Sequence, residues 1–275
     1  MFKSIAMSTL PKPAYEFLRT IRNRLRSARN QRRDPADIFG EIYQKNLWSA
    51  DLDQAFSGPG SRGALAEDYV SFVADYVIRH RIQSILDIGV GDFHVGRALL
   101  EKLATLGWKG SYTGCDVVKP LVDRHRLENT RTDVTFLCLD AISDPLPTAE
   151  LCLIRQVLQH LSNDAAGKVL AKIDFFQHTI VSEHHPAPQN LRLANVDKAT
   201  GGDVRVSQGS GMFPQFPPFN RNYRIERSLP ISDGVIVNSE TDAARQERLA
   251  ILVKSPASPA GATGLRLVSD NTAAA

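Results

Sequence analysis

The chain has no apolar run long enough to cross a bilayer. Its longest runs, such as Leu151–Ile154 and Val235–Val237, span only a few residues, whereas a membrane-spanning helix needs about 20. Residues 1–13 also lack the apolar stretch and the small-residue cleavage site of a secretory signal. We therefore expect neither a transmembrane segment nor export.

Cysteine is scarce as well. The sequence holds three, Cys115, Cys138 and Cys152, an odd number at wide spacing. They make neither a disulfide framework nor a Cys-x-x-Cys zinc motif. This usage is typical of a reducing compartment, and we expect the protein to be cytoplasmic.

Positive charge is missing from most of the chain. The net charge is +3, but residues 1–40 hold nine lysines and arginines against three acids, a net of +6, so the other 235 residues carry −3. A body without excess positive charge makes a broad nucleic-acid groove unlikely as a partner site. Hydrophobic residues make up 43% and charged residues 23%, which excludes wholesale disorder.

The basic segment, residues 1–40, is expected to form an N-terminal arm. Within it, Ala14–Arg33 has apolar residues at helical spacing and arginines along an adjacent face, and Asp34-Pro35 ends the predicted helix. Residues 14–33 could contact a membrane surface or a polyanion, or they could dock on their own domain. Residues 256–275, rich in Pro, Ala, Gly and Ser, are expected to be disordered.

Residues 41–255 are expected to form one α/β domain. Short apolar strands alternate with helices, a pattern that indicates a parallel sheet covered on both faces. Right-handed crossovers make this a Rossmann-like, doubly wound fold, and we expect seven strands, mostly parallel, with an antiparallel closing strand. The predicted strands are 84–88, 111–116, 134–139, 151–155, 179–183, 223–227 and 248–253, and the predicted helices are 64–80, 95–106, 120–128 and 164–176.

Residues 186–224 interrupt this alternation. The segment is rich in Gly and Pro but also holds Phe213, Phe216 and Phe219. A long irregular insertion is usually a functional loop or a disordered one, and its aromatic content favours an ordered lid that closes over a substrate. The alternative is that the phenylalanines fill a hydrophobic gap beside the sheet.

The most informative stretch is Asp87-Ile88-Gly89-Val90-Gly91-Asp92. A buried strand leads into a glycine turn and then a helix, where open α/β sheets bind ligands at the carboxyl ends of strands. A dinucleotide fingerprint needs a third glycine where His94 stands. Asp87 and Asp92 would repel a pyrophosphate but suit a ligand that carries an ammonium and a sulfonium.

Two further acids end the next two predicted strands. Asp116 could accept hydrogen bonds from both hydroxyls of a ribose, and Asp140 could meet the edge of an adenine. Three acids at the ends of three consecutive strands point to a nucleoside. The alternative is that all three are ordinary turn residues.

The turn at 87–92, together with Asp116 and Asp140, resembles the class I S-adenosylmethionine-dependent methyltransferases. Leu151–Leu161 is similar to the fourth-strand motif of members that act on small molecules. The likeness covers about residues 57–255. More narrowly, Trp48, Ser57-Gly58-Pro59-Gly60-Ser61, Asp144–Pro147 and the run at 155–161 resemble a bacterial group linked to glycan or polysaccharide modification.

This resemblance implies S-adenosylmethionine as the cofactor and methyl transfer to a small-molecule or glycan hydroxyl. It places Asp87, Gly89 and Gly91 at the methionine moiety, Asp116 at the ribose and Asp140 at the adenine. Val90, between the glycines, departs from the commoner pattern but leaves the backbone geometry possible. The residues expected at the cofactor are Gly58, Gly60, Asp87, Gly89, Gly91, Asp92, Phe93, Asp116, Val117, Asp140, Ala141 and Arg155.

A hydroxyl nucleophile also needs a general base. His160 is the first candidate, because it follows the fourth strand and has a suitable ordinary pKa; the alternative is a packing histidine. Glu183 and His184, at the end of the fifth strand, complete the predicted catalytic set, although alternation lets only one of His184 and His185 face the site. A Glu-His-His metal site lacks a further ligand at diagnostic spacing, and we expect no metal.

Other roles stay open. Arg155 could orient an acidic substrate or the cofactor carboxylate, or form a salt bridge at the sheet end. The Asn/Asp-Pro-Pro-Tyr/Phe motif of enzymes that methylate base amines is missing at 154–157. The rival functions are an RNA methyltransferase guided by the basic arm and a non-catalytic, methyltransferase-like binding subunit. Variable loops build acceptor pockets in this fold, here Phe39–Ser61 and Pro186–Arg224.

Overall fold

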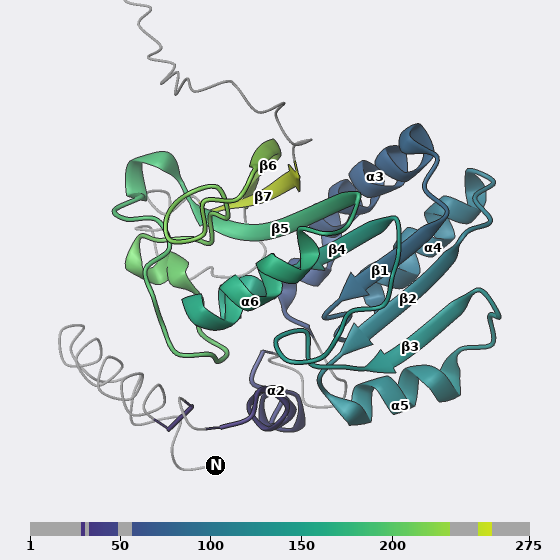
Figure 1. The fold of residues 1–275 in the computed structure, drawn as a ribbon, viewed down its shortest axis with the longest axis horizontal. Helices are drawn as coiled ribbons and strands as arrows, with labels where there is room; N and C mark the ends of the chain where they lie inside the picture. The colour runs from purple at the N-terminus through teal and green to yellow at the C-terminus, as the bar shows by residue number, and fades with distance from the viewer. Residues whose placement is uncertain (1–28, 31–32, 49–56, 232–246, 255–275) are drawn as a thin grey trace, which may run out of the picture.

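A computed structural model describes residues 29–30, 33–48, 57–231 and 247–254 (Figure 1). Its centre is a seven-stranded sheet in the order β3-β2-β1-β4-β5-β7-β6. The strands are β1 Ser84–Ile88, β2 Ser111–Asp116, β3 Val134–Cys138, β4 Leu151–Arg155, β5 His178–Pro186, β6 Tyr223–Ile231 and β7 Glu247–Lys254.

The first five strands pair in parallel, and β7 pairs antiparallel with both β5 and β6. The predicted doubly wound sheet, mostly parallel with an antiparallel closing strand, is therefore confirmed. The chain runs outward from β1 through β2 to β3, and then returns to β4 on the other side of β1. The strand order thus reverses between β1 and β4, the place where such sheets bind ligands.

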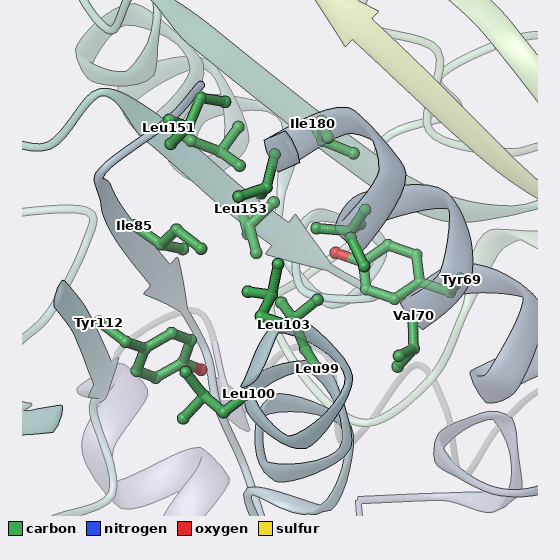
Figure 2. Packing of buried hydrophobic residues seen from close by; sticks show 14 of the residues in the cluster. Tyr69, Val70, Ile85, Leu99, Leu100, Leu103, Tyr112, Leu151, Leu153 and Ile180 are labelled. Carbon is green, nitrogen blue, oxygen red and sulfur yellow. The ribbon is translucent and has the colours of Figure 1, made fainter. Parts of the chain in front are cut away.

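Helices cover both faces of the sheet. The helices α3 (Gly63–His80), α4 (His94–Thr105) and α5 (Lys119–Glu128) pack on one face, and α6 (Asn163–Ile173) packs on the other. Figure 2 shows the first interface, where leucines of α4 meet Ile85 of β1 and Leu153 of β4. Alternation in β1 sends Leu86 to the opposite face, against α6. In the described part of the chain, no helix combines the length and apolar character needed to cross a membrane.

A helix that the sequence analysis missed, α2 (Pro35–Gln44), precedes the sheet. Asp34 is its N-cap, since the carboxylate accepts the N–H of Ala36 at 2.8 Å, and proline suits the first helical position. The Asp-Pro pair that was predicted to end a helix therefore begins one. Ile38 and Ile42 bury the inner face of α2, so a domain boundary after residue 40 would divide a packed helix. Most of the predicted basic helix at 14–33 and the tail at 256–275 lie outside the described residues.

The insertion between β5 and β6 is a packed segment with two short 3-10 turns, η3 (Pro188–Asn190) and η4 (Arg205–Gln208). The buried amide of Asn195 donates to the carbonyls of Phe213 and Pro217, both at 2.9 Å. Phe219 packs with the α6 side of the core, and the ring of Phe213 stacks on His185 at 3.9 Å. These contacts fix the insertion against β5 and α6.

Candidate active site

A cavity opens at the carboxyl ends of β1, β2 and β4, where the strand order reverses. The space between its walls, including the solvent at its mouth, is about 1130 Å³. Its floor is formed by residues 87–90 and 92 of the glycine turn and by the segment 139–142 after β3; the predicted Gly91 lies in the turn but does not line the cavity. Its other walls come from the segment after β4 and from α2, whose Phe39 and Tyr43 line the cavity.

The glycine turn has a backbone that side chains would disrupt. Gly89 has φ +77° and Gly91 has φ +54°, and a Cβ on Gly89 would collide with Val157. Asp116 holds the turn, because its carboxylate accepts the N–H groups of Gly91 and Val118, both at 2.9 Å. The turn therefore presents backbone to the cavity at close range.

Two carboxylates face this cavity from neighbouring strands. Asp87, the last residue but one of β1, is partly buried, and the hydroxyl of Tyr112 donates to it at 2.5 Å. Burial raises the pKa of Asp87 to about 6. Burial also raises the pKa of Asp116, the last residue of β2. Among the described residues no salt bridge reaches either carboxylate. A cation bound here would relieve that desolvation, so the cavity favours a positively charged ligand.

The other two acids have partners of their own. Asp92 forms a salt bridge with Arg62 at 2.9 Å and accepts the N–H of Ser57. Asp140 accepts the N–H of Ile142 at 2.9 Å and a hydroxyl from Ser143. Both line the cavity as predicted, together with Val117 and Ala141.

Arg155 closes one side of the cavity. Its guanidinium lies 5.1 Å from the ring centre of Tyr69 and donates to the carbonyl of Gly60. Its Nε atom is buried without a partner among the described residues, and burial lowers its pKa. Gly58 precedes η1 (Pro59–Ser61), and Gly60 is its middle residue. They shape the turn but do not line the cavity, unlike Ser57 and Ser61.

His160 lies in the cavity wall at the end of η2 (Leu158–His160). Its ring centre is 5.1 Å from that of Trp48 and 6.4 Å from that of Phe39. Burial, and then the charge of Lys198, lower its pKa to about 3, so the imidazole is neutral at pH 7. Its Nδ1 atom is buried and has no hydrogen-bond partner in the described structure.

Three other predicted site residues lie away from the cavity. Phe93, the residue before α4, packs its ring edge-on against Phe136 at 4.7 Å, inside the core below the turn. Glu183 is completely buried and accepts the N–H groups of Leu158 and Gln159. His184 donates its backbone N–H to the side chain of Gln159. The N–H groups of the loop after β4 bind Glu183, and of the predicted catalytic set only His160 lines the cavity.

The side chains at the end of β5 also diverge. Glu183 binds the loop amides, while the Nε2 atom of His185 lies 2.7 Å from the carbonyl oxygen of Met212. No group of three candidate metal ligands comes together in the described part of the chain.

The predicted lid does not reach the cavity either. No residue of 186–224 lines it. Phe213 and Phe219 are 6% and 9% exposed, because they pack on β5 and α6 rather than over the opening. The alternative interpretation, that these rings fill a gap beside the sheet, describes them correctly; Phe216 remains 44% exposed.

The sequence analysis expected Phe39–Ser61 at the site as a variable loop but missed the helix, α2, that forms the roof of the cavity. Pro35, Phe39 and Tyr43 lie four residues apart on one face of α2, and all three line the cavity. Trp48, Tyr69 and Gln156 also contribute. The spacing of 35, 39 and 43 was the available signal, but it was hidden once Asp34-Pro35 had been interpreted as a helix end. The expectation that Phe39–Ser61 lies at the site agrees with this placement.

Several solved structures are similar to this chain at low identity. The magnesium protoporphyrin IX methyltransferase of Synechocystis PCC 6803, with bound SAH, is 13% identical with a TM-score of 0.45, covering 81% of this chain and 100% of its own. The plantazolicin methyltransferase BpumL in complex with SAH is 13% identical with a TM-score of 0.46, covering 79% and 95%. The (4+2)-cyclase SpnF is 15% identical with a TM-score of 0.45, covering 75% and 85%. No family model and no curated protein matches the sequence. Similarity this low assigns no function, which has to come from the geometry of the cavity.

Proposed function

We propose that this cavity binds S-adenosylmethionine and that the protein transfers its methyl group to a hydroxyl of a small molecule or glycan. The observation that carries the proposal is the pair of carboxylates, the partly buried Asp87 and the buried Asp116, beside a glycine turn at the reversal of strand order. Such a site repels phosphates and attracts a nucleoside that carries positive charge.

The residues present fit this cofactor. Asp87 and the backbone of Gly89 would hold the ammonium end, and the unpartnered Nε of Arg155 would meet the carboxylate. Asp116 still has lone pairs for ribose hydroxyls after accepting two N–H groups. The segment 139–142 would border the adenine.

The bound cofactor supplies an electrophilic methyl group. The protein contributes position and exclusion of water, since Phe39 and Tyr43 of α2, with Trp48 in the turn after it, line the cavity. His160 would accept a hydrogen bond from the acceptor hydroxyl and orient its oxygen. Because burial holds the pKa of His160 near 3, it would orient the hydroxyl as a neutral acceptor and would not remove its proton beforehand, as the expected general base would. Once the oxygen carries the methyl group, its proton would pass to the imidazole and then to solvent.

The proposal is tested by following the conversion of S-adenosylmethionine to S-adenosylhomocysteine by mass spectrometry. One arm offers a set of small-molecule hydroxyl acceptors, and a second offers oligosaccharides with free hydroxyls. We expect product with a mass increase of one methyl in one arm, and a loss of at least tenfold in rate in His160→Ala. A third arm offers RNA, and methylation confined to that arm would contradict the assignment.

A further inference from the structure

Two buried side chains hold the loop that carries His160, the carboxyl group of Glu183 and the guanidinium of Arg205. We name residues 156–161 the His160 loop. Glu183, at the end of β5, accepts the N–H of Leu158 at 2.9 Å and that of Gln159 at 3.1 Å, one with each carboxylate oxygen. The carboxylate is completely buried, so it has exchanged water for these two peptide groups.

Arg205 of η4 binds the carbonyl groups of the same loop. Its Nη1 atom donates to the carbonyls of Leu158 and Gln159, at 3.3 and 3.0 Å. Its Nη2 atom donates to the carbonyl of Leu161 at 2.7 Å, while Nε donates to Val196 within the insertion. Arg205 is 1% exposed and is the largest of the completely buried side chains. Nη2 also donates to the side-chain oxygen of Asn163 at 2.9 Å. A planar guanidinium that binds these five acceptors fixes the loop in one geometry.

The carbonyl of His160 itself is also bound by the insertion. It accepts the N–H of Gly201 at 2.8 Å and the ammonium of Lys198 at 3.1 Å. The insertion that the sequence presented as a lid is therefore a brace for the catalytic loop. Glu183 and Arg205 lie on the two sides of the His160 loop. Burial raises the pKa of Glu183 to about 8, and the N–H groups of Leu158 and Gln159 and then the charge of Arg205 oppose that rise. Burial lowers the pKa of Arg205 to about 10, and Glu183 opposes that fall.

We propose that Glu183 and Arg205 are positioning residues, which together hold the His160 imidazole in the cavity wall for methyl transfer. This inference rests on the proposed function, in that it names what sets the direction of the group that meets the acceptor. Neither residue lines the cavity, so their effect on the reaction passes through the loop.

We call the hydrogen bonds from Glu183 and Arg205 to the His160 loop the clamp. Two substitutions weaken the clamp while keeping most of the side-chain volume. Arg205→Lys keeps the charge but loses the fork that reaches several carbonyls at once. Glu183→Gln replaces one acceptor oxygen by an amide that faces a backbone N–H. The matched control is Arg221→Lys, in the same insertion, where the arginine instead pairs with Asp174 of α6 at 2.8 Å.

The direct readout is the ring signal of His160 in NMR spectra of histidine-labelled protein, assigned with His160→Gln. In the parent protein we expect the ring to stay neutral from pH 5 to 8. In Arg205→Lys and Glu183→Gln we expect its apparent pKa to rise by at least one unit and the amides of Leu158 and Gln159 to exchange at least tenfold faster. The other titratable groups that act on the ring are Lys198 and His184. Burial lowers the pKa of His184 to about 4, and both residues are unchanged in every variant. The Arg221→Lys control should match the parent.

The catalytic readout separates positioning from folding. In the methyl-transfer assay we expect kcat of Arg205→Lys to fall about tenfold while the KM for S-adenosylmethionine stays within twofold. If Arg205→Lys fails to fold, Asn163→Ala removes one of the five acceptors and should shift the His160 signal in the same direction.

Failure of the clamp and failure of the proposed function give different results. Folded variants whose His160 signal and kcat match the parent would overturn the clamp, even if the cofactor binds. A parent protein that does not bind the cofactor would overturn the proposed function, whereas a His160 signal that still moves in Arg205→Lys would support the clamp.

Discussion

At the scale of single residues, Asp116 both holds the glycine turn and borders the cavity, and one substitution tests these two roles. Its carboxylate holds the N–H groups of Gly91 and Val118 and borders the cavity. In Asp116→Asn one acceptor becomes a donor, so we expect the affinity for S-adenosylhomocysteine to fall by about 1–3 kcal/mol. Equilibrium dialysis measures this.

The matched control is Asp123→Asn on α5, whose side chain is 42% exposed and pairs with Lys119. It should bind the ligand as the parent does. Equal affinity in both variants would show that Asp116 contributes neither to the turn nor to the ribose.

The buried imidazole of His185 makes stability depend on pH. Burial lowers its pKa to about 4, whereas the unfolded chain has the ordinary value near 6.5. Below pH 6.5 the unfolded state binds the proton more readily, so this residue reduces stability as the pH falls. In His185→Gln we expect the decline in unfolding free energy between pH 7 and pH 5 to be smaller, by on the order of 1–2 kcal/mol. Urea unfolding at the two pH values gives the difference, and an unchanged decline would contradict the assignment.

At the scale of elements, the insertion after β5 should behave as packed structure. Phe219→Ala deletes a ring that is 9% exposed and packs on the α6 side of the core, so we expect a loss of about 3–5 kcal/mol in unfolding free energy. Phe216→Ala, at a ring 44% exposed, should cost far less. Both folded variants should keep the parent affinity for the cofactor. A Phe216 variant that is stable but loses turnover would instead revive the lid.

The periodicity of the sequence was enough to predict the strands that build the site and the helices between them. Asp87, Asp116 and Asp140 were predicted at the site because each follows a strand, and the carboxyl ends of parallel strands meet at one edge. Glu183 was misplaced because alternation tells which face a side chain takes, not which loop folds across it. Phe93 was misplaced since its left-handed backbone, at φ +60°, turns the ring into the core. The helix that forms the roof, α2, was missed because its Asp34-Pro35 start was interpreted as the end of a preceding helix.

At the scale of the whole molecule, the strands on the two sides of the reversal supply different parts of the cavity. The carboxyl ends of β1 and β2 supply the glycine turn and the carboxylates of Asp87 and Asp116. The end of β4 and the turn after it supply Arg155 and His160. The insertion between β5 and β6 binds the loop that carries His160 through Arg205 and Gly201. It therefore joins the antiparallel part of the sheet to that loop. The central claim is therefore that one cavity, at the reversal of strand order, selects a cationic nucleoside.

Titration calorimetry with S-adenosylhomocysteine and S-adenosylmethionine tests this claim most directly. The account predicts one site per chain, with micromolar or tighter binding of both ligands, and at least tenfold weaker binding of S-adenosylmethionine in Asp87→Asn, which removes the charge but keeps the shape. It also predicts no heat with NAD, whose pyrophosphate would face Asp87. Absence of binding at millimolar S-adenosylmethionine, or equal affinity in Asp87→Asn, would contradict it.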